Sequence, residues 1–205
     1  MKSAYLPGIP PWLSYGVLYF LSVYLTLYFS GGDTVNVAVW LASGFALAGV
    51  MLHGYWVLPG ILVGALLALQ ANQLSIASSA IHALGAVAAA LTAGALLRSQ
   101  EPPYRLLQNS QQMSKFLLSS SLIFPLFAIL ASLVIVYLDG RSIRDSIAPI
   151  IISVWLSHTI GIFLVAPLVE SWPTLAQMPV YVLLGVVWLL PLRRFLIWME
   201  TGRWS

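Results

Sequence analysis

Long apolar stretches separated by short polar connections run through most of the chain. The longest lies between Asn36 and Arg98, and it contains no Asp, Glu, Lys or Arg before its final residue. A helix needs about 20 mostly apolar residues to cross a bilayer, so this interval alone accommodates three closely packed spans. The pattern predicts an all-α protein, a polytopic transmembrane helix bundle that forms a single integral membrane domain over residues 1–205.

The same length rule divides the whole chain into about seven spans, within a range of six to eight. We expect them over Trp12–Ser30, Val35–His53, Trp56–Asn72, Ile76–Arg98, Phe116–Leu138, Ile147–Val169 and Met178–Leu192. A tight turn at Gly54 separates the second span from the third, and such short connections force neighbouring spans to run antiparallel. Pro125 is expected to break or kink the fifth span, because proline lacks the N–H that a helix needs.

Small residues recur at four-residue spacing, for example at Gly60 and Gly64 and at Gly85 and Ala89. In lipid, such pairs allow helix backbones to approach closely. They are compatible with a dimer face, but several spans carry the pattern, which favours packing within one bundle.

Composition agrees with a membrane protein. Hydrophobic residues make up 60% of the 205 and charged residues only 7%, whereas soluble chains carry roughly a quarter charged residues. The net charge of +3 is spread over loops and both ends, so we expect no nucleic-acid partner and interpret the basic residues as topology signals and contacts to lipid headgroups. They favour a cytoplasmic N-terminus. The absence of cysteine excludes disulfides, thiolate metal sites and cysteine nucleophiles.

The acidic residues lie in predicted loops or at span ends. They are Asp33, Glu101, Asp139, Asp145, Glu170 and Glu200. A carboxylate inside a span would mark an ion or proton path, so this placement argues against a proton-coupled transporter. The sequence also lacks a Gly-rich phosphate loop, an HExxH motif and a catalytic triad. It therefore predicts neither an enzyme nor a metal site.

Two histidines lie inside predicted spans, His82 in the fourth and His158 near the middle of the sixth. Intramembrane histidines on separate helices can ligate a b-type haem. If both spans run the same way, however, the two depths differ by about 8 Å at 1.5 Å per residue, a poor geometry for one haem. We therefore expect no cofactor. Each imidazole can instead bond to a neighbouring helix, and we interpret His158 as lining a polar cavity.

Two groups of Trp, Gly and Pro residues carry a resemblance. The first comprises Trp40, Ser43, Gly44, Gly54, Pro59 and Gly64, and the second Trp155, Gly161, Ala166, Pro167, Leu168 and Trp172. In order and spacing the chain resembles the bacterial membrane-associated sensor domain of the first described type. That domain forms the N-terminal membrane part of many sensor histidine kinases and diguanylate cyclases. The resemblance covers most of Trp12 to Trp172.

Three positions depart from the family pattern. Leu41-Ala42 replaces the proline before the Ser-Gly pair, Trp56 lies three residues before Pro59 rather than beside it, and His158 stands where an Asp is usual. The family also leads into a cytoplasmic signalling domain, whereas this chain ends at Ser205. We therefore expect a signal to pass to a separate partner.

The resemblance implies a membrane-embedded sensory or ligand-binding module of the bacterial inner membrane. An accessory subunit of a larger membrane protein complex is the alternative, and a small-solute transport subunit comes third. Expected partners are membrane lipid and other membrane or signalling proteins. The candidate ligand-binding residues are Trp40, Ser43, His82, Trp155 and His158. The candidate structural residues are Gly44, Pro59, Gly64, Gly161 and Pro167.

Overall fold

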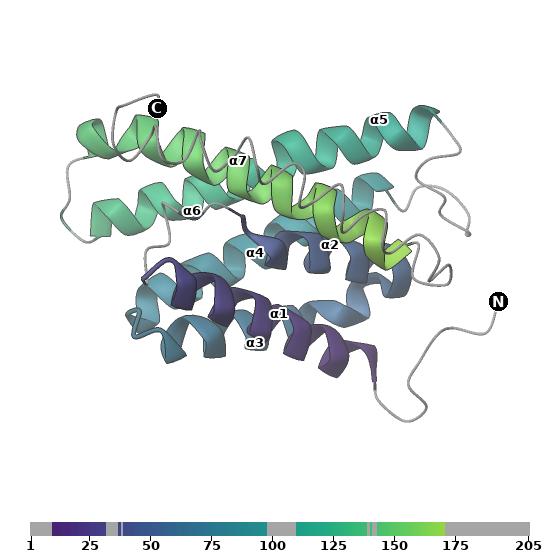
Figure 1. Ribbon diagram of the computed structural model, residues 1–205, viewed down its shortest axis with the longest axis horizontal. Coiled ribbons are helices and arrows are strands. Elements are labelled where there is room, and N and C mark those ends of the chain that lie inside the picture. The colour runs from purple at the N-terminus through teal and green to yellow at the C-terminus, as the bar shows by residue number, and fades with distance from the viewer. Residues whose placement is uncertain are drawn as a thin grey trace.

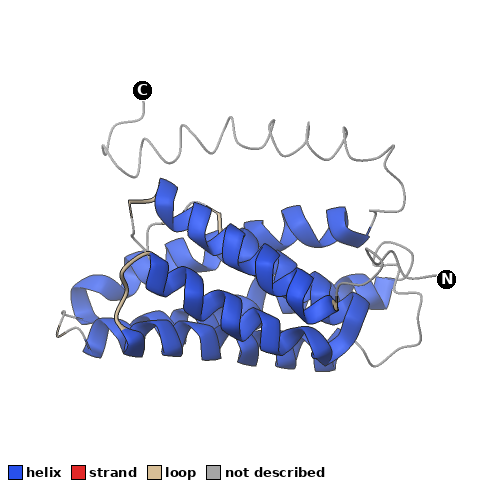
Figure 2. Cartoon of the chain, turned by 90° about the horizontal axis from the view of Figure 1, so that it is seen from below, coloured by secondary structure: helices blue, strands red, loops and turns tan. Residues whose placement is uncertain are grey.

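The described part of the chain is helical. The computed structural model describes residues 10–31, 37, 39–97, 110–138, 140 and 143–170. The helices are α1 (Pro11–Phe29), α2 (Leu41–His53), α3 (Leu58–Ala71), α4 (Ile76–Leu97), α5 (Ser110–Leu118), α6 (Phe124–Leu138) and α7 (Ile143–Glu170). A 3₁₀ turn (Gly54–Val57) joins α2 to α3, and a π turn (Ser119–Ile123) joins α5 to α6. Figure 2 shows the described residues as helices with a few short loops and no strand, which confirms the all-α class.

Five helical runs among the described residues are long and apolar enough to cross a membrane. They are Pro11–Phe29, Leu41–Ala71, Ile76–Leu97, Met113–Leu138 and Ile150–Pro167. The protein is therefore a multi-pass membrane protein, and the expected count of about seven spans is matched only approximately. The seventh predicted span, Met178–Leu192, lies outside the described residues.

Helix α2 runs antiparallel to α1. The ring of Tyr15, near the start of α1, lies 5.3 Å from the ring of His53 at the end of α2. Tyr19, one turn further along α1, forms a side-chain hydrogen bond with Trp40 at the start of α2. The earlier residue of α1 thus contacts the end of α2, and the later residue contacts its start.

Helix α3, by contrast, runs parallel to α1. A Cβ atom added at Gly60 would collide with the carbonyl of Trp12, and one added at Gly64 with the carbonyl of Gly16. The chain thus reverses between α2 and α3, at Gly54, whose φ of +72° favours glycine. The run Leu41–Ala71 is two antiparallel segments, as predicted, and these glycine pairs pack inside the bundle.

Three prolines, Pro59, Pro125 and Pro167, fall where helices start, break and end. Pro59 occupies the first turn of α3, where its missing N–H breaks no helical bond. Pro125 directly follows the π turn and the first residue of α6, so the predicted interruption of the fifth span is confirmed. Pro167 lies in the last turn of α7, which continues to Glu170.

Helices α2 and α4 form the middle of the bundle. Helix α2 packs against α1, α4 and α7, whereas α4 packs against α2, α3 and α6. The α1–α3 pair and the α6–α7 pair therefore lie on opposite sides of α2 and α4 (Figure 1). The fully buried core consists of residues such as Leu27, Leu47 and Ile61, while Phe29 and Trp56 are each 81% exposed. Outward apolar side chains suit contact with lipid.

Candidate ligand-binding site

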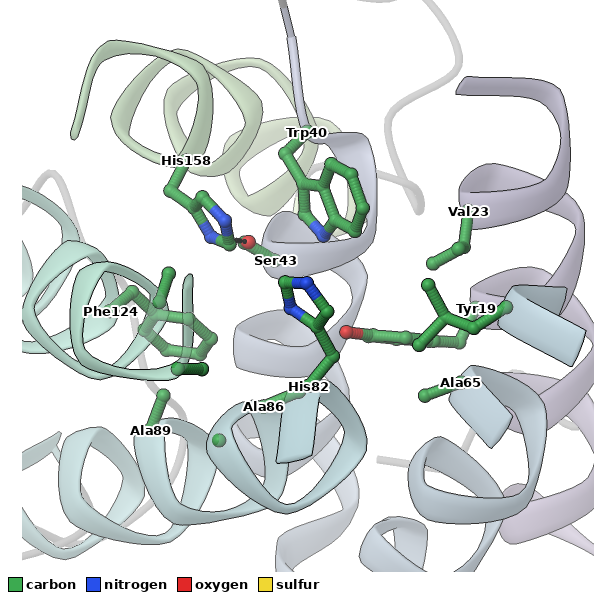
Figure 3. Close-up of a pocket in the computed structure, with 14 residues that line it drawn as sticks. Tyr19, Val23, Trp40, Ser43, Ala65, His82, Ala86, Ala89, Phe124 and His158 are labelled. Atoms are coloured by element: carbon green, nitrogen blue, oxygen red, sulfur yellow. Dashed lines mark hydrogen bonds between the residues drawn. The ribbon is translucent and has the colours of Figure 1, made fainter. Parts of the chain in front are cut away.

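A small cavity of about 30 Å³ lies where six helices meet. Figure 3 shows side chains from α1, α2, α4, α6 and α7 converging on it. Its polar lining is Tyr19, Trp40, Ser43, His82 and His158. Its apolar lining is Val23, Ala65, Leu69, Gly85, Ala86, Ala89, Phe124, Ala128 and Ala131. Four of the five predicted ligand-binding residues thus come together at one place.

The start of α2 is fixed to the middle of α7 by three interactions. Ser43 Oγ lies 2.6 Å from His158 Nδ1, within hydrogen-bond distance. The Trp40 ring stacks on the His158 ring at 5.6 Å between centroids and 17° between planes. The backbone N–H of Trp40 donates to the carbonyl of Ser157 at 2.9 Å. These bonds satisfy polar groups that would otherwise be buried unpaired in an apolar bundle.

Two glycines make this close approach possible. A Cβ atom at Gly161 would overlap the carbonyl of Trp40, and one at Gly44 would overlap Val165. Any larger residue at either position would push α2 and α7 apart. Trp40, Ser43 and Gly44 of the first motif therefore pack against α7, the helix that carries Gly161 of the second motif.

His82 reaches the same cavity from α4. Its ring points into the cavity, toward the same space as the Trp40 indole and the Tyr19 hydroxyl (Figure 3). Among the described residues, its Nε2 atom is buried and has no hydrogen-bond partner. This is an unusual state for a polar atom and requires an explanation.

The two histidines line the same cavity, His82 from α4 and His158 from α7. The cavity of about 30 Å³ is far smaller than the roughly 300–1,000 Å³ of pockets for drug-sized ligands and cofactors, so it does not accommodate a haem.

Comparison with known families identifies this arrangement. The MASE1 family model matches residues 10–191, which include the whole cavity and both motif segments. The chain belongs to the MASE1 family. MASE1 is a membrane-associated sensory domain of histidine kinases and diguanylate cyclases, so the predicted resemblance is confirmed. The chain matches no curated protein and no solved structure.

Trp155 lies outside the cavity of this MASE1 domain, although it was selected as a ligand-binding candidate. Its side chain is 41% exposed, and its indole N–H donates to the carbonyl of Ser121 at 2.7 Å. One turn later on α7, the hydroxyl of Thr159 donates to the carbonyl of Ser120 at 3.3 Å. Both side chains therefore bind the π turn between α5 and α6.

The π turn and Pro125 remove the usual α-helical donors of these two carbonyls. The N–H of Phe124 donates to the carbonyl of Ser119, five residues earlier, and so bypasses Ser120. Pro125 has no N–H and therefore cannot donate to Ser121. Helix α7 supplies a donor to each of the two carbonyls.

Tyr19 also lines the cavity of the MASE1 domain, and sequence inspection had not selected it. Its side chain is only 3% exposed and bonds to Trp40. One sequence feature could have indicated it. Apolar or aromatic residues recur every four positions on α1, and these four are all buried on one face: Tyr15, Tyr19, Val23 and Leu27. Tyrosine is common at membrane interfaces, so the sequence of a Tyr-rich span does not show which tyrosine points into the bundle.

Proposed function

We propose that this MASE1 chain is the sensory input module of a signalling system in the bacterial inner membrane. The cavity between α2, α4 and α7 is its ligand-binding site, and a separate partner protein receives the signal. The module itself carries out no catalysis. The observation behind this proposal is that two imidazoles, two hydroxyls and an indole gather at one cavity inside a bundle whose buried residues are mostly apolar.

The lining favours a neutral polar ligand. Polar side chains are expensive inside a bilayer, which makes an intramembrane cluster a functional candidate. Among the described residues, no Asp, Glu, Lys or Arg lines the cavity to balance an ion, and an unpaired charge in such surroundings would cost many kcal/mol. A neutral molecule with hydrogen-bond donors and acceptors matches the hydroxyls and imidazoles.

Signal transmission follows from where the ligand would bind. Ser43 and His158 join α2 to α7 through one hydrogen bond of 2.6 Å. A ligand that competes for either side chain would weaken this contact and shift the position of α2 relative to α7. A ligand changes a conformational equilibrium only through such a difference in contacts between two states.

Thermal unfolding with a panel of solutes tests the ligand site. We expect a neutral polar solute at 100 times its Kd to stabilise the protein by about 2.7 kcal/mol, which raises the apparent Tm by roughly 5–10 °C for a chain of this size. Ser43→Ala should remove most of this shift. Ser132→Ala, which alters a buried serine that does not line the cavity, should retain it.

Two results would contradict the ligand site. One is a panel in which no solute raises the Tm. The other is a solute that stabilises the wild type and Ser43→Ala equally, because such binding must occur elsewhere.

The partner is tested by native mass spectrometry of the protein gently extracted from its own host. We expect stoichiometric recovery with a protein that carries a kinase or cyclase domain, together with bound lipid. Recovery with a complex that lacks any signalling domain would favour an accessory subunit instead. Recovery of the lone chain, with and without ligand, would rule out a stable partner.

A further inference from the structure

The unpartnered Nε2 of His82 is the starting point. This atom is buried, yet no described residue bonds to it. A buried polar atom left without a partner costs about 1–3 kcal/mol. A histidine in this position is therefore expected to bond to something that occupies the cavity.

The cavity has room for water. Its volume is about 30 Å³, and one water molecule needs roughly 10–15 Å³ by this measure, so about two molecules fit. Apolar cavities of similar size stay dry, whereas polar ones are filled by water that makes two to four hydrogen bonds. The volume and the lining both point to water.

Enough polar atoms face the cavity to hold these molecules. Tyr19 accepts a hydrogen bond from Trp40, because an indole N–H only donates, and it keeps its own hydroxyl hydrogen to donate. The Tyr19 hydroxyl points toward the His82 ring (Figure 3). On the other side lie Ser43 and His158, already bonded to each other. Water both donates and accepts, so it satisfies His82 in either neutral tautomer.

We propose that the cavity is a hydrated site, in which about two water molecules bridge His82 on α4 to the Ser43–His158 pair. The water completes a hydrogen-bond network that joins α4 to α2 and α7. This inference does not depend on the proposed sensory function. It does restrict any ligand of this site, which must replace the hydrogen bonds of the water that it displaces.

Water-edited solid-state NMR of ¹⁵N-histidine-labelled protein in lipid bilayers tests the proposal. The three histidines are assigned by comparison with His53→Gln and His82→Leu. We expect water magnetisation to reach the His82 ring about as strongly as it reaches His53 at the end of α2. A His82 signal that stays at background level would overturn the proposal.

A cavity-filling variant gives an independent readout. Ala86 lines the cavity, so the two added methyl groups of Ala86→Val should displace the water, cut the transfer to His82 at least by half and lower the apparent Tm. Ala77→Val, an exposed position on the same helix outside the cavity, should change neither. If Ala86→Val raises the Tm and leaves the transfer unchanged, the cavity is dry and the proposal is wrong.

The His82→Leu variant shows whether the His82 imidazole stabilises or destabilises the folded protein. In a hydrated cavity, leucine removes a bonded imidazole and should lower the apparent Tm by a few degrees. In a dry cavity it removes an unsatisfied atom and should raise it. A lower Tm of His82→Leu therefore supports the hydrated cavity, and a higher Tm contradicts it.

Discussion

At the scale of single residues, the glycines determine the geometry of the site as much as the polar side chains do. Gly161 lies directly against the carbonyl of Trp40, and this approach lets His158 reach both the Trp40 ring and Ser43. A β-carbon there would occupy the space of a backbone atom, which cannot rotate away as a side chain can. The geometry of the polar site therefore depends on a residue that has no polar group.

Gly161→Ala should destabilise the protein by about 1–3 kcal/mol, because overpacking forces α2 away from α7. The matched control is Gly85→Ala, whose new Cβ atom would lie 3.2 Å from Ala131 Cβ and needs only a small adjustment. Thermal unfolding of both variants provides the measurement. Equal Tm values for the two variants would contradict the importance of this backbone contact.

The three- and four-residue spacing on α7 separates two roles that sequence inspection merged. His158, Gly161 and Val165 face α2, while Trp155 and Thr159 face the π turn. Both sets follow the helical period, so each lies on one face. Trp155 and His158 are only three residues apart, and nothing in the sequence states that their partners differ. His158 lines the cavity, and Trp155 does not.

At the scale of helices, the π turn is a local break that another helix repairs. Pro125 and the bond from Phe124 to Ser119 remove the usual α-helical donors of the Ser120 and Ser121 carbonyls, and α7 donates to both. Phe124 follows this turn and also lines the cavity. The break therefore positions a cavity residue while it fixes α6 to α7.

Trp155→Phe should lower stability by about 1–3 kcal/mol, because it leaves the carbonyl of Ser121 without a donor. Adding Pro125→Ala should recover most of the loss, since alanine restores an N–H four residues after Ser121. Trp56→Phe, at a position that is 81% exposed in the 3₁₀ turn, serves as the control.

The double variant, Trp155→Phe with Pro125→Ala, distinguishes a lost hydrogen bond from lost packing. Apparent Tm values of the single and double variants form a thermodynamic cycle. Strictly additive losses would mean that Trp155 stabilises the protein through packing alone, and not by replacing the bond that Pro125 removes.

At the scale of the whole molecule, the decisive feature is the reversal at Gly54. By length and composition alone, Leu41–Ala71 is one long apolar run. Its contacts with α1 show that it turns back, with α2 antiparallel and α3 parallel to α1. The reversal brings the start of α2 to the level of Tyr19, near the middle of α1, and so creates the polar site inside the bundle.

Single-cysteine labelling tests this topology, and the native chain contains no cysteine to interfere. Phe29, Trp56 and Ile76 are 81%, 81% and 78% exposed at three helix ends. With the reversal, Phe29→Cys and Ile76→Cys should react with an impermeant maleimide on one side of the membrane, and Trp56→Cys on the other. If Leu41–Ala71 crossed once, Phe29 and Ile76 would lie on opposite sides.

The sequence by itself determined the all-helical membrane class, the turn at Gly54, the break near Pro125 and the family. Each of these follows from local chemistry: apolar length, the missing N–H of proline, the conformational freedom of glycine, and a fixed order of Trp, Gly and Pro. Only the tertiary structure brought His82, Tyr19 and Ser43 to one cavity and directed Trp155 to the π turn. Which faces of two helices meet depends on their relative rotation and tilt, and one chain's residue order does not specify either.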